Sequence, residues 1–335
     1  MALSKKGQKK IEGTKLQEQA NESAAKGDFL NASYYAISAL NSFSQAEDSE
    51  GIKACKKLTS EYNKKAEAQM VSHTISIPMG EKLTDELKRI INNLTKSDSV
   101  EENLLSISRA SYLVPSFADA QRNAKNIVPV TAQLVTSINY GDDGNLNSFD
   151  DFSGDWLIDN YGFGMDFSMM ALNLIFSELI SKGQFTEDGI MDILLAKKIF
   201  DADYLLKFQA VLKRYFAGDF LSSIHLLVPL IEKTFMTLSG LLGLDVITFN
   251  GEKMSTRNKT LASNMLYSPE YQKVWGKDFC IMLDFFLLNA RAHRFRHKVA
   301  HGDIRVADCN FTSFNVLFFF IIRMILLIHV EEKSE

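Results

Sequence analysis

The segment from residue 314 to residue 330 limits the possible folds of this chain more than any other feature. Its centre reads Val-Leu-Phe-Phe-Phe-Ile-Ile-Arg-Met-Ile-Leu-Leu-Ile. The segment is shorter than the roughly 20 residues that a membrane-spanning helix needs, and Arg323 at its middle would be costly to bury in hydrocarbon. It therefore predicts the buried last helix of a helical bundle. Apolar residues make up 46% of the chain and charged residues 23%, which is typical of a soluble protein with a substantial core.

The C-terminal part reads as four main helices with short connections. Gly218 and Gly302, each followed by aspartate, mark the ends of the first and third helices. Ser268 and Pro269 predict a short extra helical turn, with serine at the N-cap and proline at the first helical position. Such helices fit an up-down four-helix bundle. The predicted helices span residues 204–216, 221–242, 278–301 and 312–332.

The third of these helices is predicted to end in a cluster of cations and histidines. Apolar residues recur along it at spacings of three and four, which predicts one buried face. Gly302 follows where a left-handed C-cap is expected. The buried face would hold the helix in place and leave Arg296, His297 and His301 on its flanks. The predicted apolar face consists of Ile281, Phe285, Leu288, Ala292, Phe295 and Val299.

The sequence from Arg296 to His301 has the form Arg, four residues, His. This pattern resembles the signature of the HEPN superfamily (higher eukaryotes and prokaryotes nucleotide-binding), small helical bundles that include many metal-independent ribonucleases. The ending Ala300-His301-Gly302 is more specifically similar to an uncharacterised bacterial HEPN-type family found in defence loci. Members of that family usually carry Asn directly after the Arg, and His297 takes that position here.

A second stretch strengthens the resemblance. Residues 216–233 contain a Gly-Asp turn followed by a helix that reads Leu-Val-Pro, two residues, Glu, and Glu232 takes the last position. His225 and Glu232 are seven residues apart, so they are expected on roughly the same helix face. Both are accessory site candidates, but a structural partner is favoured for each because buried acids and histidines need one. The resemblance covers residues 201–335 well and the first half of the chain poorly.

The resemblance implies a metal-independent endoribonuclease that acts on RNA as a toxin or abortive-infection (antiphage) effector. RNA cleavage by internal transesterification needs a group that transfers a proton, a role that suits His301. It also needs a cation to neutralise the phosphorane, a role that suits the donor fork of Arg296. His297 is an accessory candidate, and Arg291 and Arg294 remain alternative partners because the family allows spacings of four to six. No metal or other cofactor is required.

The spacing of Arg296 and His301 bears on assembly. At about 100° per residue, five positions set the two side chains about 140° apart around the axis, if the helix continues through His301. They converge only if the helix unwinds before His301 or if a twofold partner completes the site. HEPN ribonucleases commonly form dimers with their motifs facing one another, so the resemblance implies a homodimer.

The same residues allow other interpretations. His293, His297 and His301 recur every four residues, and a neighbouring pair could ligate zinc. The third histidine cannot reach the same ion, and the nearby arginines oppose a cation. A structural basic helix end, stabilised by the helix dipole, is a further alternative. Another is a non-catalytic helical module that binds RNA, a nucleotide or a partner protein through this surface.

The rest of the chain is also predicted to be helical, so the expected fold class is all-α. Residues 201–335 would form the HEPN-like bundle. Residues 71–200 are expected to form a helical middle region, with an acidic loop rich in glycine and aspartate at 140–155. Residues 1–70 are expected to form a helical hairpin region that would suit a regulatory protein partner, and within it residues 20–52 resemble one degenerate tetratricopeptide unit. The residues at that unit's packing positions are Gly27, Leu30, Ala39, Phe43 and Ala46.

Charge and cysteine content restrict the setting in which the protein works. The net charge is −4, so any RNA contact must come from a local basic patch. Cys55, Cys280 and Cys309 are odd in number and widely spaced, which indicates free thiols in a reducing compartment. No apolar stretch follows the first lysines, so no signal peptide is expected. These features predict a cytoplasmic protein without membrane association.

Overall fold

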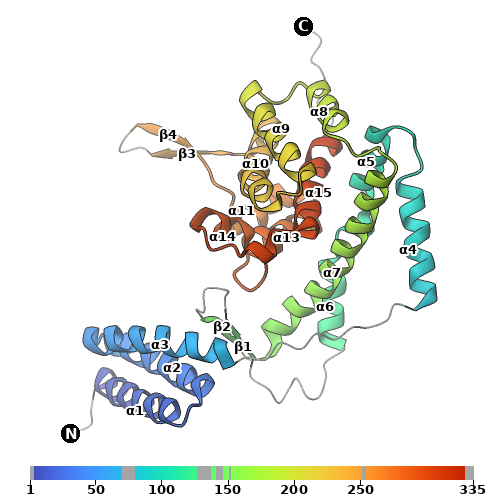
Figure 1. Ribbon diagram of the computed structural model, residues 1–335. Helices are drawn as coiled ribbons and strands as arrows, with labels where there is room; N and C mark the ends of the chain where they lie inside the picture. The colour runs from blue at the N-terminus through green and yellow to red at the C-terminus, as the bar shows by residue number, and fades with distance from the viewer. Residues whose placement is uncertain are drawn as a thin grey trace. The chain divides into compact units, whose positions relative to one another are not determined.

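The computed structural model describes residues 4–69, 80–126, 137–140, 146–150, 152–250 and 254–328. Most of these residues are helical, and their strands form two small two-stranded antiparallel sheets (Figure 1). The all-α fold class predicted from the sequence is therefore confirmed. The chain divides into two compact units, one of residues 1–77 and 136–151 and the other of residues 78–135 and 152–335.

The first unit is built on three helices that approach each other closely. Small side chains line the helix contacts, and the ring of Phe43 fills the space beside two glycines. A Cβ added at Gly13 or Gly51 would lie 2.9 or 2.5 Å from that ring, so neither position has room for a side chain. The hairpin predicted for residues 1–70 is thus extended by a third helix. The helices are α1 (Lys5–Ala25), α2 (Phe29–Ala46) and α3 (Ser49–Gln69).

The acidic loop predicted at 140–155 is replaced in part by regular structure. β1 (Ser137–Tyr140) pairs with β2 (Leu146–Asp150), and both belong to the first unit. α7 begins at Phe152, inside the predicted loop. Residues 141–145 and 151 lie outside the described residues. The prediction missed the strands because turn residues are as typical of hairpin connections as of long loops.

The second unit holds the remaining helices and a short β-hairpin. Two 3₁₀ turns, Ser111–Leu113 and Val306–Asp308, join its helices. The hairpin consists of β3 (Ile247–Asn250) and β4 (Ser255–Asn258). The helices are α4 (Glu81–Leu94), α5 (Val100–Arg109), α6 (Phe117–Asn126), α7 (Phe152–Ser181), α8 (Glu187–Ala196), α9 (Ala202–Phe216), α10 (Phe220–Leu241), α11 (Ser263–Leu266), α12 (Pro269–Trp275), α13 (Lys277–Leu287), α14 (Phe295–His301) and α15 (Phe311–Leu327).

The apolar last helix lies in the core of this unit, as predicted. Phe314, Phe318, Phe319 and Phe320 are fully buried, and α15 packs on α5, α7 and α10. Arg323 donates a hydrogen bond to the carbonyl of Ser108, and its guanidinium lies 5.2 Å from the ring centroid of Phe279. Burial lowers the pKa of Arg323. The charge that argued against a membrane span is therefore accommodated within the protein.

The core does not stop at the predicted boundary between residues 71–200 and 201–335. One hydrophobic cluster runs from Leu87 on α4 to Leu326 on α15. Because α15 packs on helices from both sides of residue 200, these helices share one core. The predicted helices at 204–216 and 221–242 match α9 and α10 to within two residues.

The single helix predicted over residues 278–301 was wrong. α13 ends at Leu287, and the Asn289 N–H turns back to the carbonyl of Asp284 at 2.8 Å. The Asn289 side chain then accepts a hydrogen bond from the Arg291 N–H at 2.9 Å. This local bond competes with helix continuation, and Arg294 reverses the chain with φ 54° before α14 starts. The predicted apolar face is thus divided between two helices.

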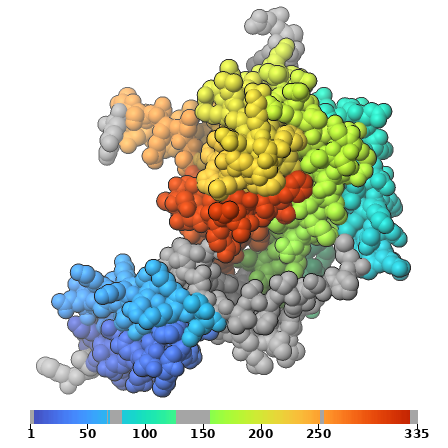
Figure 2. Space-filling view, in the orientation of Figure 1, coloured from blue at the N-terminus to red at the C-terminus, as the bar shows by residue number. Residues whose placement is uncertain are grey.

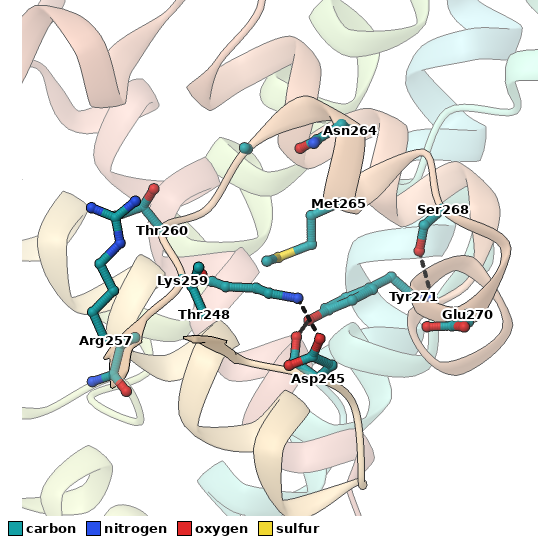
Figure 3. Close-up of a pocket in the computed structure, with 12 residues that line it drawn as sticks. Asp245, Thr248, Arg257, Lys259, Thr260, Asn264, Met265, Ser268, Glu270 and Tyr271 are labelled. Carbon is teal, nitrogen blue, oxygen red and sulfur yellow. Dashed lines mark hydrogen bonds and ion pairs between the residues drawn. The ribbon is translucent and has the colours of Figure 1, made fainter. Parts of the chain in front are cut away.

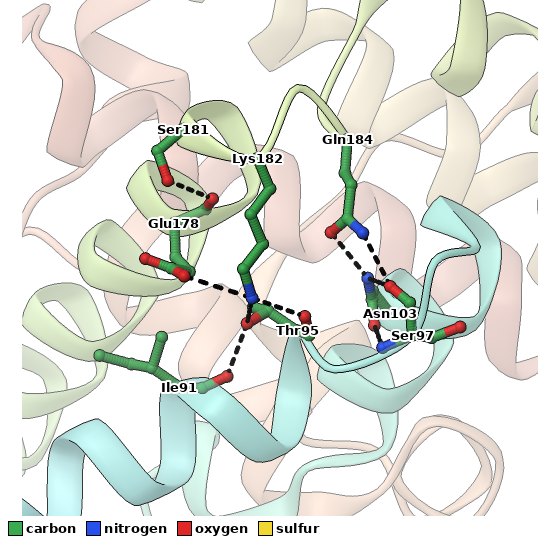
Figure 4. A network of polar contacts seen from close by, with 8 residues as sticks. All are labelled: Ile91, Thr95, Ser97, Asn103, Glu178, Ser181, Lys182 and Gln184. Atoms are coloured by element: carbon green, nitrogen blue, oxygen red, sulfur yellow. Dashed lines mark hydrogen bonds and ion pairs between the residues drawn. The ribbon is translucent and has the colours of Figure 1, made fainter.

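A polar network ties the turn between α4 and α5 to the end of α7 (Figure 4). Lys182 donates to the carbonyl and the hydroxyl of Thr95 at 2.9 and 3.0 Å, and it forms an ion pair with Glu178 at 3.2 Å. Gln184 accepts from Asn103 at 3.0 Å. These contacts satisfy backbone groups that would otherwise be left without partners at the helix ends.

In the described part of the chain, two helices are long and apolar enough to cross a membrane, Trp156–Ser181 and Phe220–Leu241. The most apolar stretch of the first helix is 39% buried inside the protein, and the most apolar stretch of the second helix is 56% buried. Packing against α9, α14 and α15 gives the apolar side chains of α10 partners within the chain. The absence of membrane association stays a prediction.

Candidate functional site

Arg296, the predicted cationic site residue, is bound to Glu232. Its Nε donates to Glu232 Oε2 at 2.6 Å and its Nη2 donates to Glu232 Oε1 at 3.2 Å, so both carboxylate oxygens are engaged. The Leu261 N–H also donates to Glu232 Oε1, at 2.9 Å. These bonds fix α14 to α10, which lie side by side at the surface of the second unit (Figure 2). Glu232 thus has the structural partner that the sequence favoured for it.

His301, the predicted proton-transfer residue, lies at the other end of α14 and is exposed. Its ring packs against that of the half-buried His297, with 4.2 Å between centroids. α14 stays helical through His301 and ends at Gly302, whose left-handed φ of 74° confirms the predicted C-cap. Because the helix does not unwind, Arg296 and His301 remain about 140° apart around its axis. Within one chain, Arg296 is bonded to Glu232 and His301 packs against His297, but Arg296 and His301 are not brought together.

His293 is separated from the other two histidines. Its ring packs on Phe286 and Phe285, with centroids 4.5 and 5.9 Å away. It precedes α14, so the predicted recurrence of three histidines on one helix does not exist. Within the described ranges, no group of three histidine, cysteine, aspartate or glutamate side chains is placed to hold a metal ion.

The alternative arginines lie before α14. Arg291 is half-buried in the connection after α13, and Arg294 is the residue that precedes the first turn of α14. About 10 Å of helix separates the Cα atoms of Arg294 and His301. The backbone therefore does not bring Arg294 beside His301.

His225, the second accessory candidate, does not contact Glu232. Its Nδ1 lies 2.8 Å from the carbonyl of Leu221, one turn earlier on α10. It lines a cavity of about 520 Å³ between α9 and α10, together with Lys207 and Lys233. His225 and Glu232 therefore lie in different surroundings, although both belong to α10.

Two further cavities share Asn258 and Lys259 in their linings, and no sequence pattern predicted either of them. One, of about 460 Å³, is lined by Glu232, Lys233 and Lys259, and the next, of about 560 Å³, shares Lys259 (Figure 3). Lys259 donates to Asp245 at 2.6 Å and holds the pKa of that carboxyl below its usual range. The second cavity has two acidic and two basic side chains in its lining, so it is suited to polar ligands without a strong preference for anions, whereas the first has two lysines and one glutamate. The first cavity is lined mostly by α10, and the second by the β3–β4 hairpin and the segment from Lys259 to Tyr271, an arrangement that no motif indicated.

Comparison with known proteins gives no relative for this chain: no family model, no curated protein and no solved structure matches it.

Proposed function

We propose that this chain is a metal-independent endoribonuclease of HEPN type, with its site at the exposed end of α14. The observation that carries the proposal is the contact between His297 and His301 at the surface, with 4.2 Å between ring centroids. Two adjacent imidazoles can accept and donate protons near neutral pH. Cationic side chains on the same short helix supply charge for a phosphate.

The proposed reaction is internal transesterification. His301 takes the proton of an RNA 2′-hydroxyl, and the 2′-oxygen attacks the adjacent phosphorus. The bond from phosphorus to the 5′-oxygen breaks, and the 5′-oxygen leaves with a proton donated by the imidazole pair of His297 and His301. The products are a 2′,3′-cyclic phosphate and a free 5′-hydroxyl. For Arg296 to neutralise the phosphorane, its donors must exchange the Glu232 carboxylate for the phosphate.

The decisive experiment is to incubate the purified protein with mixed cellular RNA in EDTA, with wild type beside His301→Ala. Cleavage should survive chelation, leave cyclic phosphate ends and fall at least about a hundredfold in His301→Ala, the usual scale for lost acid–base help. His297→Ala should reduce cleavage less. Since His301 is exposed, the melting temperature of His301→Ala should equal that of wild type, which separates lost chemistry from lost fold. Equal cleavage by wild type and His301→Ala would exclude the nuclease.

The biological role is part of the same proposal. As a toxin or abortive-infection effector in the cytoplasm, the wild type should arrest bacterial growth when expressed, and His301→Ala should not.

A homodimer would bring Arg296 of one chain to His301 of another, because a single chain keeps them apart.

A second candidate function is a non-catalytic helical module that binds RNA, a nucleotide or a partner protein. The observation that favours it is the bidentate ion pair of Arg296 with Glu232, which already occupies the donor fork. Such a module would bind RNA in the same assay and release no cyclic phosphate ends.

A further inference from the structure

A row of four lysines runs along the exposed face of α3 in the first unit. Lys53, Lys56, Lys57 and Lys64 are all exposed, and at about 100° per residue they fall within an arc of about 100° around the helix. From Lys53 to Lys64 the row extends about 16 Å along the axis. We call these four residues the α3 lysine row. Figure 2 shows the α3 surface in light blue.

The α3 lysine row lacks the close ion pairs that several other lysines of the first unit form. Among the described residues, none of its four members forms an ion pair. Glu61, which flanks the row, is bound by Lys65 at 2.8 Å and also interacts electrostatically with Lys57, and in sequence Glu67 follows the end of the row. Lysines three and four positions apart on a helix repel one another, so an anion bound along this face would relieve the repulsion. The lysines with acidic partners at 2.6 to 2.9 Å are Lys6, Lys9, Lys10 and Lys65.

The surroundings of the row favour a polyphosphate over a membrane or a protein surface. The opposite side of α3 carries buried Cys55, Tyr62 and Ala66, so its apolar face is unavailable to lipid. Among the described side chains of α3, no large apolar one is exposed, and such side chains usually anchor protein interfaces. A linear row of point charges matches the regularly spaced phosphates of a single strand.

We propose that the α3 lysine row binds the phosphate backbone of single-stranded RNA, as a contact separate from the α14 site. The choice of RNA over other nucleic acids rests on the proposed function. The contact itself requires no cleavage, so it is tested by binding alone.

The test measures binding of the full-length chain to a fluorescent 2′-O-methyl RNA, whose blocked 2′-oxygen prevents transesterification, at several salt concentrations. One variant carries Lys→Gln at Lys53, Lys56, Lys57 and Lys64. Each lost phosphate contact should lower the slope of log affinity against log salt by about 0.7, so the slope should fall by about 3 and the affinity at low salt at least tenfold. The matched control removes the same number of charges from the same unit, with Lys→Gln at Lys6, Lys9, Lys10 and Lys65.

The control should keep its slope within about one of the wild type, because its lysines are engaged by acids. A third variant with arginine at the four row positions should bind like wild type and shows that charge, not fold, is responsible. Equal losses in the row and control variants, or unchanged RNA binding in the row variant, would overturn the proposal. Loss of binding to phosphatidylserine vesicles with RNA binding intact would assign the row to membranes instead. If RNA binding depends on the α3 lysine row but no RNA is cleaved, the proposed nuclease activity is wrong and the proposed RNA contact is supported.

Discussion

At the scale of single residues, the bond between Arg296 and Glu232 decides how mutations at the candidate site must be interpreted. α14 has seven residues, too few to be stable as an isolated helix, so its position depends on tertiary contacts. The two bonds to Glu232 supply one of these contacts. Replacing Arg296 with Ala would therefore remove a structural bond together with any catalytic role. His301, which is exposed, is the cleaner probe of chemistry.

We expect Arg296→Ala and Glu232→Ala each to lower the free energy of unfolding by about 1–2 kcal/mol, discounted because 32% and 23% of the two side chains remain exposed. The double variant should lose about 1 kcal/mol less than the sum, because the two residues share one interaction. Urea unfolding of all four proteins measures this coupling. The exposed pair of Lys207 and Asp203, treated in the same way, should show no measurable coupling. Strict additivity for Arg296 and Glu232 would show that the ion pair does not stabilise α14.

At the scale of helices, the apolar face of α15 should behave as protein core. Phe318 is fully buried among Phe176, Phe185 and Phe208, so Phe318→Ala should cost about 3–5 kcal/mol of stability in detergent-free buffer. Phe163 on α7 is 65% exposed, and Phe163→Ala should change stability by about 0.5 kcal/mol or less. Thermal and urea unfolding of the two variants compare these costs. A wild-type protein recovered only with detergent would contradict the packing argument.

The helices also show which parts of the fold could be predicted from the sequence and which could not. α9, α10 and α15 were predicted because caps and long apolar runs are local signals. The break after Leu287 was not, because it depends on the Asn289 side chain and on the stacking of Phe286 with Phe295 at 4.8 Å, a contact between separate helices. Glu232 was identified as a candidate, but its bond to Arg296 joins residues 64 positions apart and no pattern could assign it.

At the scale of the whole molecule, the geometry of α14 makes assembly the central question. The helix presents Arg296 to α10 and His301 to solvent, so the two predicted catalytic residues do not meet in one chain. The alternative to a dimer is local unwinding of the helix before His301. In the structure, α14 is helical through His301 and is capped at Gly302, so it is not unwound there. If both residues act on one phosphate, a twofold partner must supply one of them.

The composite site predicts complementation between inactive variants. Arg296→Gln keeps a donor for Glu232 and removes the charged fork, and His301→Ala removes the proton-transfer group. Random pairing of equal amounts makes half of the dimers mixed, and each mixed dimer carries one intact site, so about a quarter of wild-type cleavage should return. Mixing His301→Ala with His301→Gln should restore nothing, which controls for contamination and concentration. Sedimentation at the assay concentration reports whether dimers are present. A monomer fully active at nanomolar concentration would remove the dimer from the mechanism, and His301 would then have to act without Arg296.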